Sequence, residues 1–519
     1  MDGSGSGKSA SYSIPNAYQM LGSYVFTDPK GELYDDTAGY LKEHGYEIKV
    51  LNLVRPQYSD GYNPLKHISS EIDVDVIANT IIRGQKTDGG SSEPFWDDSA
   101  EMLLKALIYY LLATRPEEEQ NLTSCAELVR AANSNGGSNL LTELMSQLPY
   151  DHPARTNYKS IEIAPEKTYS SILSTLQSKL GKFDSKEIAE LTSTDTINFE
   201  DIGNKKTAVY VISSDTHTAY DFLLTIFFSQ MIQQLYDYAD RNGGALKIPT
   251  YFILDEFANI GKIPDFDKKI STSRSRKISF SVILQNVDQL EAVYEKSYET
   301  IMGNCDTHVF LGSNSYKTVE YFSKALGEKT IKRDSLSINR DKQFHRQGYN
   351  DSDQIMARAL MTPDELRRMD NDLCIIYEKG IKPVKARKYY YFEQHSILRK
   401  LEEMQLSHLD FDAGSRGTWR KFNPYHPYTE DEKDNKTELK VESLDDLFED
   451  DLTENTENKK VVDKPEMKVE QINDNILNDE APVLPQENNE EEIMSIDVQK
   501  ELEAKFDELF GPIEDENNN

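Results

Sequence analysis

The stretch IPTYFILDEFANIG (248–261) decides the fold of this chain. An apolar run leads directly into two carboxylates, Asp255 and Glu256. Such a run is typical of a strand that is buried on both faces of a parallel sheet covered by helices. Ligands bind beyond the carboxyl ends of the strands in sheets of this kind, so the pair is a candidate site. The alternative interpretation is a strand followed by an acidic helix cap.

Further apolar runs indicate an α/β chain with a mostly parallel sheet. They are SYVFTDPKG (23–31), EIKVLNLV (47–54), TAVYVISS (207–214), ISFSVILQN (278–286), THVFLGS (307–313) and LCIIYEKG (373–380). We expect all of them to be strands that are buried on both faces of that sheet. A long helix is expected at about 217–240.

Residues 66–200 differ from the rest, because they are rich in helical patterns. Asp97 or Asp98 is the expected N-cap of the helix AEMLLKALIYYLLA (100–113). Further on, Ile172, Leu176 and Leu180 are spaced four apart, which places them on one helical face. The sequence therefore predicts that this part of the chain is an all-α insertion.

The acidic charge of the chain is concentrated in a C-terminal tail. Residues 430–519 hold 31 Asp and Glu against 9 Lys and Arg, so they account for 22 of the 32 net negative charges. The tail is poor in aromatic residues, and this composition predicts disorder. The segments LDDLF (444–448) and FDELF (506–510) share one apolar-acidic pattern. They are candidate docking motifs that fold on a partner, with chance similarity as the alternative.

The chain begins MDGSGSGKSA (1–10), which resembles a phosphate-binding loop. The end of the pattern G-x-x-x-x-G-K-[ST] is satisfied, but Asp2 stands where its first glycine is expected. In such a loop, backbone N–H groups cradle phosphates, the lysine reaches the β- and γ-phosphates, and the hydroxyl binds Mg²⁺. The residues expected to bind the nucleotide are Gly3, Gly5, Ser6, Gly7, Lys8 and Ser9. A flexible glycine-serine linker is the alternative.

The second half of the candidate site follows in the expected order. Asp255 would hold Mg²⁺ together with Ser9, and Glu256 would polarise the attacking water. In STSRSRKISFSVILQN (271–286), Arg274 or Arg276 could reach the γ-phosphate across a subunit interface, and Gln285 could sense that phosphate or position water. Basic surface residues before a strand are the alternative for this stretch.

Other classes of protein are disfavoured by the sequence. Cys125, Cys305 and Cys374 are odd in number and show no CxxC spacing, which argues against a disulfide framework or a zinc site. No signal peptide is visible at the start of the chain. The longest apolar segment, MLLKALIYYLLA (102–113), is too short to cross a membrane and contains Lys105.

Taken together, these motifs resemble the type IV coupling proteins of conjugation and type IV secretion, of the TraG/TraD type, within the FtsK-like group of ring ATPases. The resemblance covers roughly residues 3–395, and FILDEF and TDPKGELY are its most diagnostic motifs. The matching segments are GSGSGKS with IPN (14–16), TDPKGELY (27–34), YNPL (62–65), FWDDSAEMLLKALIYYLL (95–112), FILDEFANIGKIPDF (252–266), the R-S-R…ILQN segment and LMTPDELRRM (360–369).

The resemblance implies a RecA-like P-loop motor domain that is interrupted by an all-α domain. Residues 1–65 and 201–428 would form the two parts of the ATPase domain, 66–200 the all-α inserted domain, and 429–519 the acidic tail. The residues that match the family's Walker A, Walker B, arginine and glutamine positions are Lys8, Ser9, Asp255, Glu256, Arg274 and Gln285. Asp28 and Lys30 fall in a further family motif, for which we expect structural support of the nucleotide site.

The resemblance also implies cofactors and partners. ATP and Mg²⁺ would be the cofactors of a homo-hexameric ring that accepts single-stranded DNA with its relaxase and passes it to a type IV secretion channel. Family members usually begin with transmembrane helices and with a strand before the P-loop. We therefore expect this chain to be a fragment, or to start at an internal Met. The full-length protein would lie at the cytoplasmic face of the bacterial cell membrane, whereas this chain would be soluble and cytoplasmic.

DNA contact is expected in the stretch 317–346. Its basic residues could track a phosphate backbone, and Tyr316 and Tyr321 lie nearby for stacking on bases. The basic residues are Lys324, Lys329, Lys332, Arg333, Arg340 and Lys342. A solvated helix and hairpin is the alternative.

The sequence leaves two alternatives to a translocase of single-stranded DNA. One is a substrate-docking receptor with little ATPase activity, and the other is an FtsK-like double-stranded DNA translocase.

Overall fold

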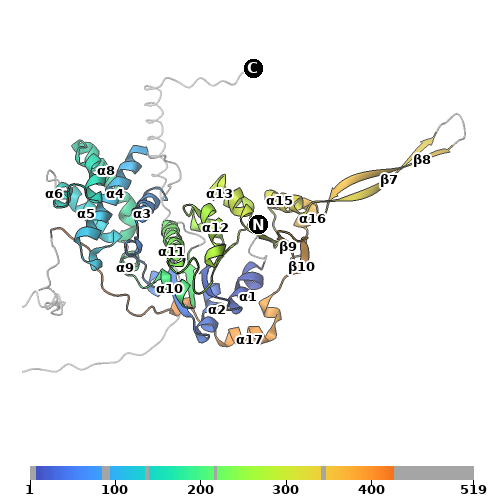
Figure 1. Ribbon diagram of the computed structural model, residues 1–519, viewed down its shortest axis with the longest axis horizontal. Helices are drawn as coiled ribbons and strands as arrows, with labels where there is room; N and C mark the ends of the chain where they lie inside the picture. The colour runs from blue at the N-terminus through green and yellow to red at the C-terminus, as the bar shows by residue number, and fades with distance from the viewer. Residues whose placement is uncertain (1–6, 85–93, 135–139, 215–218, 341–346, 426–519) are drawn as a thin grey trace, which may run out of the picture. The chain divides into compact units, whose positions relative to one another are not determined.

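A five-stranded parallel sheet forms the centre of the molecule (Figure 1). The computed structural model describes residues 7–84, 94–134, 140–214, 219–340 and 347–425. The strand order is β2-β3-β1-β4-β5. The bounds are β1 Ser23–Thr27, β2 Glu47–Asn52, β3 Thr207–Ile212, β4 Thr250–Leu254 and β5 Ile278–Val282. Thr27 pairs with Leu254 and Leu254 pairs with Val282, so the residues that follow β1, β4 and β5 lie at one edge of the sheet.

The two faces of the sheet contribute to two hydrophobic cores. Alternate residues of each strand point to opposite faces, so Val25 lies in one core and its neighbours Tyr24 and Phe26 lie in the other. The first core is shared with α11, Asp221–Arg241, and with the helical region that precedes it. The second is covered by α1 Ile14–Tyr18, α2 Glu32–Glu43 and α17 His395–Glu403. This α/β layering was expected from the unbroken apolar runs.

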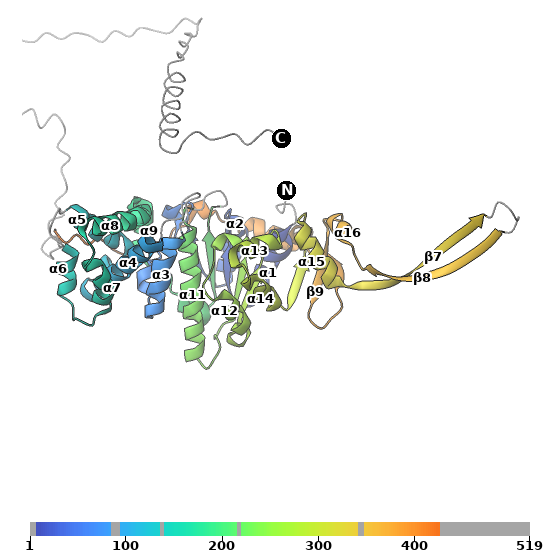
Figure 2. The same ribbon diagram turned by 90° about the horizontal axis from the view of Figure 1, so that it is seen from above.

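Between β2 and β3, the described residues form helices only. The α-helices are α3 Glu71–Arg83, α4 Pro94–Thr114, α5 Leu122–Ser134, α6 Leu140–Ser146, α7 Pro153–Glu162, α8 Glu166–Leu180, α9 Lys186–Ser193 and α10 Phe199–Asn204 (Figures 1 and 2). Ile172, Leu176 and Leu180 are buried along α8, as their spacing predicted. Because β2 and β3 are neighbours in the sheet, the helical region is inserted between two adjacent strands.

The start of α4 differs from our prediction. Asp97 and Asp98 do not cap this helix, because it already begins at Pro94, and Asp97 lies in its first turn. Proline is favoured at the first position of a helix, where its missing N–H costs nothing, and a carboxylate in the first turn is stabilised by the helix dipole.

Two of the expected parallel strands belong to another sheet. β6 Thr307–Phe310 and β9 Leu373–Glu378 pair antiparallel with each other, and β10 Val384–Arg387 pairs antiparallel with β9. The prediction that β6 and β9 would be buried within the parallel sheet was therefore wrong. An antiparallel sheet can leave one face in water, and in β6 only Phe310 is buried. Helix α15, Tyr316–Leu326, packs on this small sheet through Val319 and Phe322.

A long hairpin follows α15. Strands β7 Glu328–Arg340 and β8 Gln347–Ala359 pair only with each other, and Figure 1 shows them extending away from the parallel sheet. The remaining helices are α12 Phe266–Thr272, α13 Val287–Tyr294, α14 Ser297–Gly303 and α16 Pro363–Arg367. None of the helices within the described ranges is long and apolar enough to cross a membrane.

Candidate nucleotide site at the carboxyl ends of the strands

The loop at the start of the described chain turns sharply at Gly7. Its φ is +71°, a left-handed conformation that side chains with a Cβ rarely adopt. A Cβ at this position would also lie 2.8 Å from the ring of Tyr390. A π-helical turn, Ser9–Ser13, follows and runs into α1. The backbone N–H and the hydroxyl of Ser11 both donate to the carbonyl of Gly7, at 2.8 and 2.7 Å, which fixes the loop against this turn.

Three of the predicted site residues meet at the edge of the sheet. The Nζ atom of Lys8 lies 3.4 Å from Oδ1 of Asp255, and the Oγ atom of Ser9 lies 3.5 Å from Oδ2. The side chains of Lys8 and Asp255 are each only 11% exposed. The segments meet across a separation of 246 residues because β4 ends directly beneath the loop. The two halves recognised in the sequence therefore form one cluster.

Asp255 is held in place from two directions. The hydroxyl of Thr27, at the end of β1, donates to the backbone carbonyl of Asp255 at 2.7 Å. The backbone N–H of Glu256 donates to the Asp255 carboxylate at 3.0 Å. Sequence reasoning missed Thr27, although a threonine at the end of the strand next to β4 is a position from which a side chain can reach the site.

Glu256 occupies a left-handed backbone conformation, with φ 52° and ψ 46°. Non-glycine residues in this region are uncommon and cluster at functional sites. Its carboxylate accepts one hydrogen bond from the Asn259 amide at 3.1 Å and another from the Gln285 amide at 2.9 Å. Gln285 therefore contacts Glu256, whereas Asn259 was not recognised from the sequence. Its signal is a polar amide three residues after a candidate catalytic carboxylate.

The two arginines of the R-S-R segment have different environments. Arg276 donates two hydrogen bonds of 2.9 Å to Asp240, and its guanidinium lies 4.6 Å from the ring centre of Tyr236. Arg274 is 91% exposed and makes a 3.5 Å contact with Asp306. Both arginines precede β5, whereas Gln285 follows it, so the structure places them at the opposite end of this strand from Glu256.

Asp28 and Lys30 follow β1 at the same edge of the sheet. Asp28 is 2% exposed, and burial raises the pKa of its carboxyl to about 6. It accepts the backbone N–H of Tyr34 at 2.8 Å, which ties the β1 end to helix α2. Lys30 is exposed. Gly3, Gly5 and Ser6, which were expected to bind the nucleotide, lie outside the described residues.

The chemistry of the donor set suits a nucleotide with Mg²⁺. Mg²⁺ prefers oxygen ligands and is usually held by one or two protein oxygens together with phosphates and waters. The hydroxyl of Ser9 and the carboxylate of Asp255 are ligands of this type. Within the described ranges, no group of three or more His, Cys, Asp or Glu could hold a metal ion by itself. The three cysteines are free thiols.

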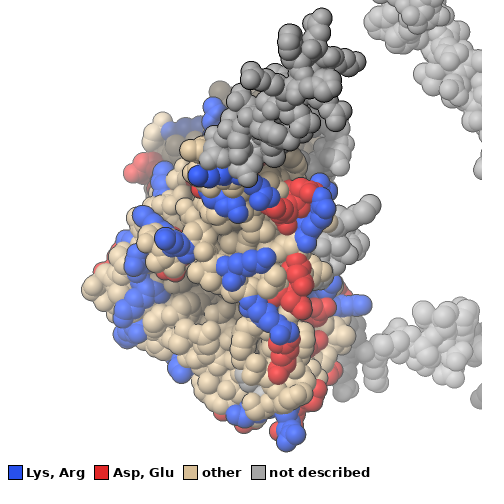
Figure 3. Space-filling model, turned by 90° about the vertical axis from the view of Figure 1, so that its right-hand side faces the viewer, with Lys and Arg blue, Asp and Glu red and all other residues tan. Residues whose placement is uncertain are grey.

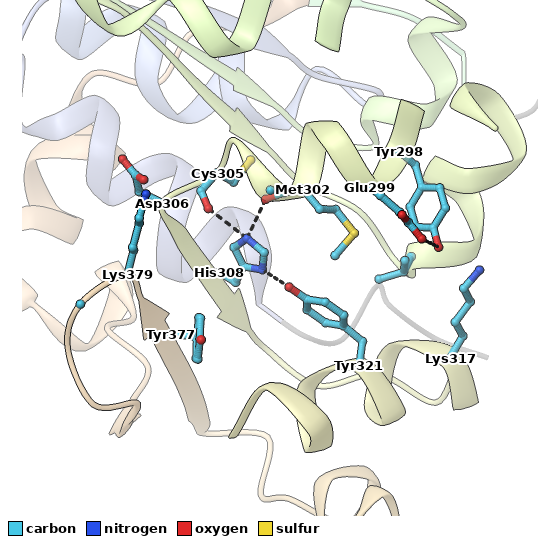
Figure 4. Close-up of a pocket in the computed structure, with 13 residues that line it drawn as sticks. Tyr298, Glu299, Met302, Cys305, Asp306, His308, Lys317, Tyr321, Tyr377 and Lys379 are labelled. Carbon is cyan, nitrogen blue, oxygen red and sulfur yellow. Dashed lines mark hydrogen bonds between the residues drawn. The ribbon is translucent and has the colours of Figure 1, made fainter. Parts of the chain in front are cut away.

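A cavity of about 540 Å³ lies away from this cluster, beside the small antiparallel sheet (Figure 4). His308 is one of the residues that line it. The Nε2 atom lies 3.0 Å from the carbonyls of Met302 and Cys305, and Nδ1 lies 2.7 Å from the Tyr321 hydroxyl. Carbonyls only accept hydrogen bonds, so Nε2 carries a proton and donates to them, while Nδ1 is hydrogen-bonded to the Tyr321 hydroxyl. This histidine links α14, β6 and α15, and both of its ring nitrogens are satisfied.

The stretch expected to contact DNA covers α15 and part of the hairpin. Lys324, Lys329 and Lys332 are exposed, and Tyr316 is 67% exposed. Tyr321 is half-buried and bonded to His308, so its ring is less accessible than that of Tyr316. Lys and Arg side chains are spread over the face shown in Figure 3, with Asp and Glu side chains among them. The side chains of Arg333, Arg340 and Lys342 lie outside the described residues, as does the acidic tail with its two candidate docking motifs.

Comparisons with known proteins agree with the motifs. The family model for type IV secretory system conjugative DNA transfer matches residues 1–414. Protein VirD4 of Agrobacterium fabrum is 24% identical over 424 residues, which cover 78% of this chain and 59% of VirD4. Conjugal transfer protein TraG of Escherichia coli is 26% identical over 386 residues, which cover 70% of this chain and 60% of TraG. The chain thus spans about three fifths of the length of these curated relatives.

A solved structure shares the fold. The bacterial conjugative coupling protein TrwBdeltaN70, in its unbound form, matches with a TM-score of 0.53 at 17% identity, covering 74% of this chain and 83% of that chain. This likeness supports the α/β architecture with its inserted helices. The family match extends over most of the chain, including the loop at Lys8 and the strand that ends at Asp255. The chain therefore belongs to the family of conjugative DNA transfer proteins of type IV secretory systems.

Proposed function

We propose that this chain is the motor part of a type IV coupling protein, which hydrolyses ATP to move single-stranded DNA with its relaxase into a secretion channel. The observation that carries the proposal is the convergence of Lys8, Ser9 and Asp255 at the edge of the parallel sheet. An ammonium group, a hydroxyl and a carboxylate at the carboxyl ends of the strands form the protein half of a site for a nucleoside triphosphate with Mg²⁺.

Each residue of the cluster has a role in this proposal. Lys8 binds the β- and γ-phosphates, while Ser9 and Asp255 hold Mg²⁺, which supplies charge neutralisation on the phosphate oxygens. Glu256 orients and polarises the attacking water. Asn259 and Gln285 keep the Glu256 carboxylate in one orientation through their two hydrogen bonds. Gln285 would sense the γ-phosphate and transmit its state to Glu256, because the Gln285 amide donates a hydrogen bond directly to the Glu256 carboxylate.

Arg274 cannot act on the site of its own subunit, since β5 separates the two. We assign it to the neighbouring subunit's nucleotide in a homo-hexameric ring. Its 91% exposure leaves the guanidinium available for such a contact, whereas Arg276 is engaged by Asp240 and Tyr236. An arginine supplied in this way can be worth a factor of about 10³ or more in turnover.

For the DNA, we propose contacts from the face that carries α15 and the hairpin. Exposed lysines there would bind phosphates, and Tyr316 is the exposed aromatic side chain for stacking on bases. In the whole protein, this motor would work at the cytoplasmic face of the bacterial cell membrane.

The first experiment is steady-state ATP hydrolysis by the full chain, with and without single-stranded DNA. We expect DNA-stimulated turnover that is abolished in Glu256→Gln, which retains ATP binding, and in Lys8→Ala, which loses it. Lys42→Ala is the control, because this lysine is exposed in the last turn of α2 and has no role in the proposed site. Normal turnover of Glu256→Gln would disprove the role given to Glu256.

The same assay separates the other two functions. ATP binding without turnover, with relaxase binding unaffected by Glu256→Gln, would favour a docking receptor. Stimulation by double-stranded DNA alone would favour an FtsK-like translocase.

The role of Arg274 is tested by mixing Arg274→Ala chains with Lys8→Ala chains, each of which we expect to be inactive alone. Because each mixed ring holds interfaces with one intact site and one intact arginine, we expect partial recovery of turnover.

A further inference from the structure

A second cavity, of about 480 Å³, lies against the helical turns that follow the phosphate-binding loop. One wall is formed by Ser11, Pro15, Tyr18 and Gln19, which repeat at helical spacing and share one face of these turns. The opposite wall comes from Tyr389 and Tyr391, which are more than 350 residues away in the sequence. Its volume is within the range of small-molecule sites.

We propose that this cavity is the subsite for the base of the ATP whose phosphates bind at Lys8. This inference rests on the proposed nucleotide site and adds the residues that recognise the nucleoside end of the ligand. Three independent observations support it: the connection of the cavity to the loop, the character of its lining and the exposure of its aromatic side chains.

The cavity is connected to the loop from both walls. On one side, Ser11 lines the cavity, and its hydroxyl donates to the carbonyl of Gly7 at 2.7 Å. On the other side, Tyr390 lies between the two lining tyrosines, and its ring contacts Gly7 at the position where a Cβ would stand. A ligand with its phosphates on the loop and its base in the cavity would therefore extend along a continuous surface.

The lining suits an uncharged aromatic group. The described residues that line the cavity include three tyrosines and a proline, and none of them is charged. A phosphate would find no countercharge there, whereas a flat base would find aromatic faces. The amide side chains of Asn16 and Gln19 also line it and can hydrogen-bond to the polar edge of a base. The loop at Lys8 therefore offers a basic site for the phosphates of ATP, and the cavity offers a neutral aromatic site for its base.

Tyr389 is the aromatic residue that is most available to a ligand. It is 50% exposed, although large aromatic side chains are usually buried to a greater extent. The next residue is held more firmly, because the rings of Tyr390 and Phe392 stack with centroids 5.0 Å apart. Tyr391 packs on the core formed with α1 and α2. On the other side of Tyr389, the Nζ atom of Lys388 donates to the carbonyl of Leu311 at 2.8 Å, so the chain is held before and after the ring that we expect to contact the base.

The test compares two ligands that share the phosphates and differ in the nucleoside. Binding of ATP with Mg²⁺ and of inorganic triphosphate with Mg²⁺ is measured by calorimetry on the full chain. We expect Tyr389→Ala to weaken ATP binding about tenfold, because stacking of a base on an aromatic ring has about this effect in alanine variants. Binding of inorganic triphosphate should not change. Tyr389→Phe, which keeps the ring, should bind ATP as tightly as the wild type.

Two control variants complete the design. Tyr150→Ala removes a 71%-exposed tyrosine outside the cavity and should bind both ligands normally. Lys8→Ala should lose both ligands. Equal weakening of the two ligands by Tyr389→Ala, or no weakening of either, would overturn the base subsite while leaving the phosphate site intact. The base subsite would also be overturned if the wild-type chain bound inorganic triphosphate as tightly as ATP. If the wild type bound neither ligand, both the base subsite and the proposed function would be wrong.

Discussion

At the scale of single residues, Asp28 carries a carboxylate into the interior at the edge of the sheet. It is 2% exposed, and its burial raises the pKa to about 6, although the backbone N–H groups of Tyr34 and Leu33 oppose this shift. In the unfolded chain, the same carboxyl group would have a pKa near 3.8. Between these two values the folded protein binds a proton that the unfolded chain has released, so stability falls as the pH rises through this window.

We therefore expect Asp28→Asn to be more stable than the wild type at pH 8, by about 2 to 3 kcal/mol. The amide keeps an oxygen that can accept the Tyr34 N–H, and it carries no charge that must be desolvated. The difference should shrink as the pH is lowered from about 6 towards 4, since the wild-type carboxyl group then becomes neutral. Urea unfolding of both chains across this range measures the effect. Asp410→Asn, at an exposed position, should show no such difference, and a constant gap at all pH values would disprove the explanation.

The residues of the candidate site could be read from the sequence only in part. Lys8, Ser9 and Asp255 lie in local patterns whose chemistry requires them to meet, and the structure brings them together. Asn259 could not be identified, because its bond to Glu256 depends on the left-handed turn between them. Arg274 and Arg276 look alike in the sequence. Only the position of Asp240 on α11, more than 30 residues away, distinguishes the anchored arginine from the exposed one.

At the scale of elements, helix α2 is packed unusually closely by the segment that follows α17. A Cβ at Gly39 would lie 1.8 Å from the carbonyl oxygen of Met404, a contact that real Cβ atoms do not make. Backbone cannot move aside as easily as the end of a side chain. Gly39 is therefore the position at which the C-terminal part of the described chain approaches α2 most directly.

We expect Gly39→Ala to destabilise the protein by roughly 2 kcal/mol, despite the higher helix propensity of alanine. Gly303 provides the matched control, because it lies in helix α14 with no atom within 4 Å of the position that a Cβ would occupy. Gly303→Ala should be neutral or stabilising by up to about 1 kcal/mol. Thermal unfolding of the two variants tests this difference. Equal midpoints would mean that the segment near Met404 moves away from α2 at little cost.

Strand prediction succeeded for the parallel sheet and failed for β6 and β9, although the expected burial on both faces was wrong for β5, of which only Ile278 is buried. β1, β3 and β4 are almost wholly buried, so their continuous apolar runs identified them as strands of the parallel sheet. β6 is short, and its exposed residues Thr307 and Val309 are typical of an antiparallel sheet with one face in water. Four residues cannot reveal in the sequence which partner a strand will choose, because pairing depends on β9, some 65 residues further along.

At the scale of the whole described chain, residues 395–425 connect the sheet to the helical region. The Nδ1 atom of His408 lies 2.9 Å from Oδ1 of Asp35 on α2. The Arg416 guanidinium donates to the backbone carbonyls of Pro56 and Gln57. Further along, Arg420 donates to Glu119 at 2.7 Å. Near the end of the segment, Phe422 is 3% exposed. The sequence placed most of this stretch in the second part of the ATPase domain but did not reveal its contacts with α2 and the helical region, because these partners lie 301 to 373 residues earlier.

This segment, which we call the C-terminal strap (residues 395–425), and the acidic tail after it should behave differently on truncation. A chain that ends at residue 428 keeps every contact described for the strap, so we expect its unfolding midpoint and its ATP turnover to equal those of the full chain. A chain that ends at residue 410 loses Arg416, Arg420 and Phe422. Loss of a buried phenylalanine alone costs about 3 to 5 kcal/mol. Among the described residues, the 1%-exposed Glu119 would retain Arg115 alone as its salt-bridge partner.

A point variant separates the loss of packing from the loss of chain. Phe422→Ala in the full chain should reproduce most of the destabilisation, because the ring packs under the Arg115 guanidinium at 4.2 Å and its backbone N–H is bonded to Ser124. Tyr425→Ala, three residues later at a 45%-exposed position, should have little effect. If the chain ending at residue 410 were as stable as the one ending at 428, the strap would not hold the two regions together. If the chain ending at 428 lost turnover, the acidic tail would be part of the motor, because every contact of the strap would still be present.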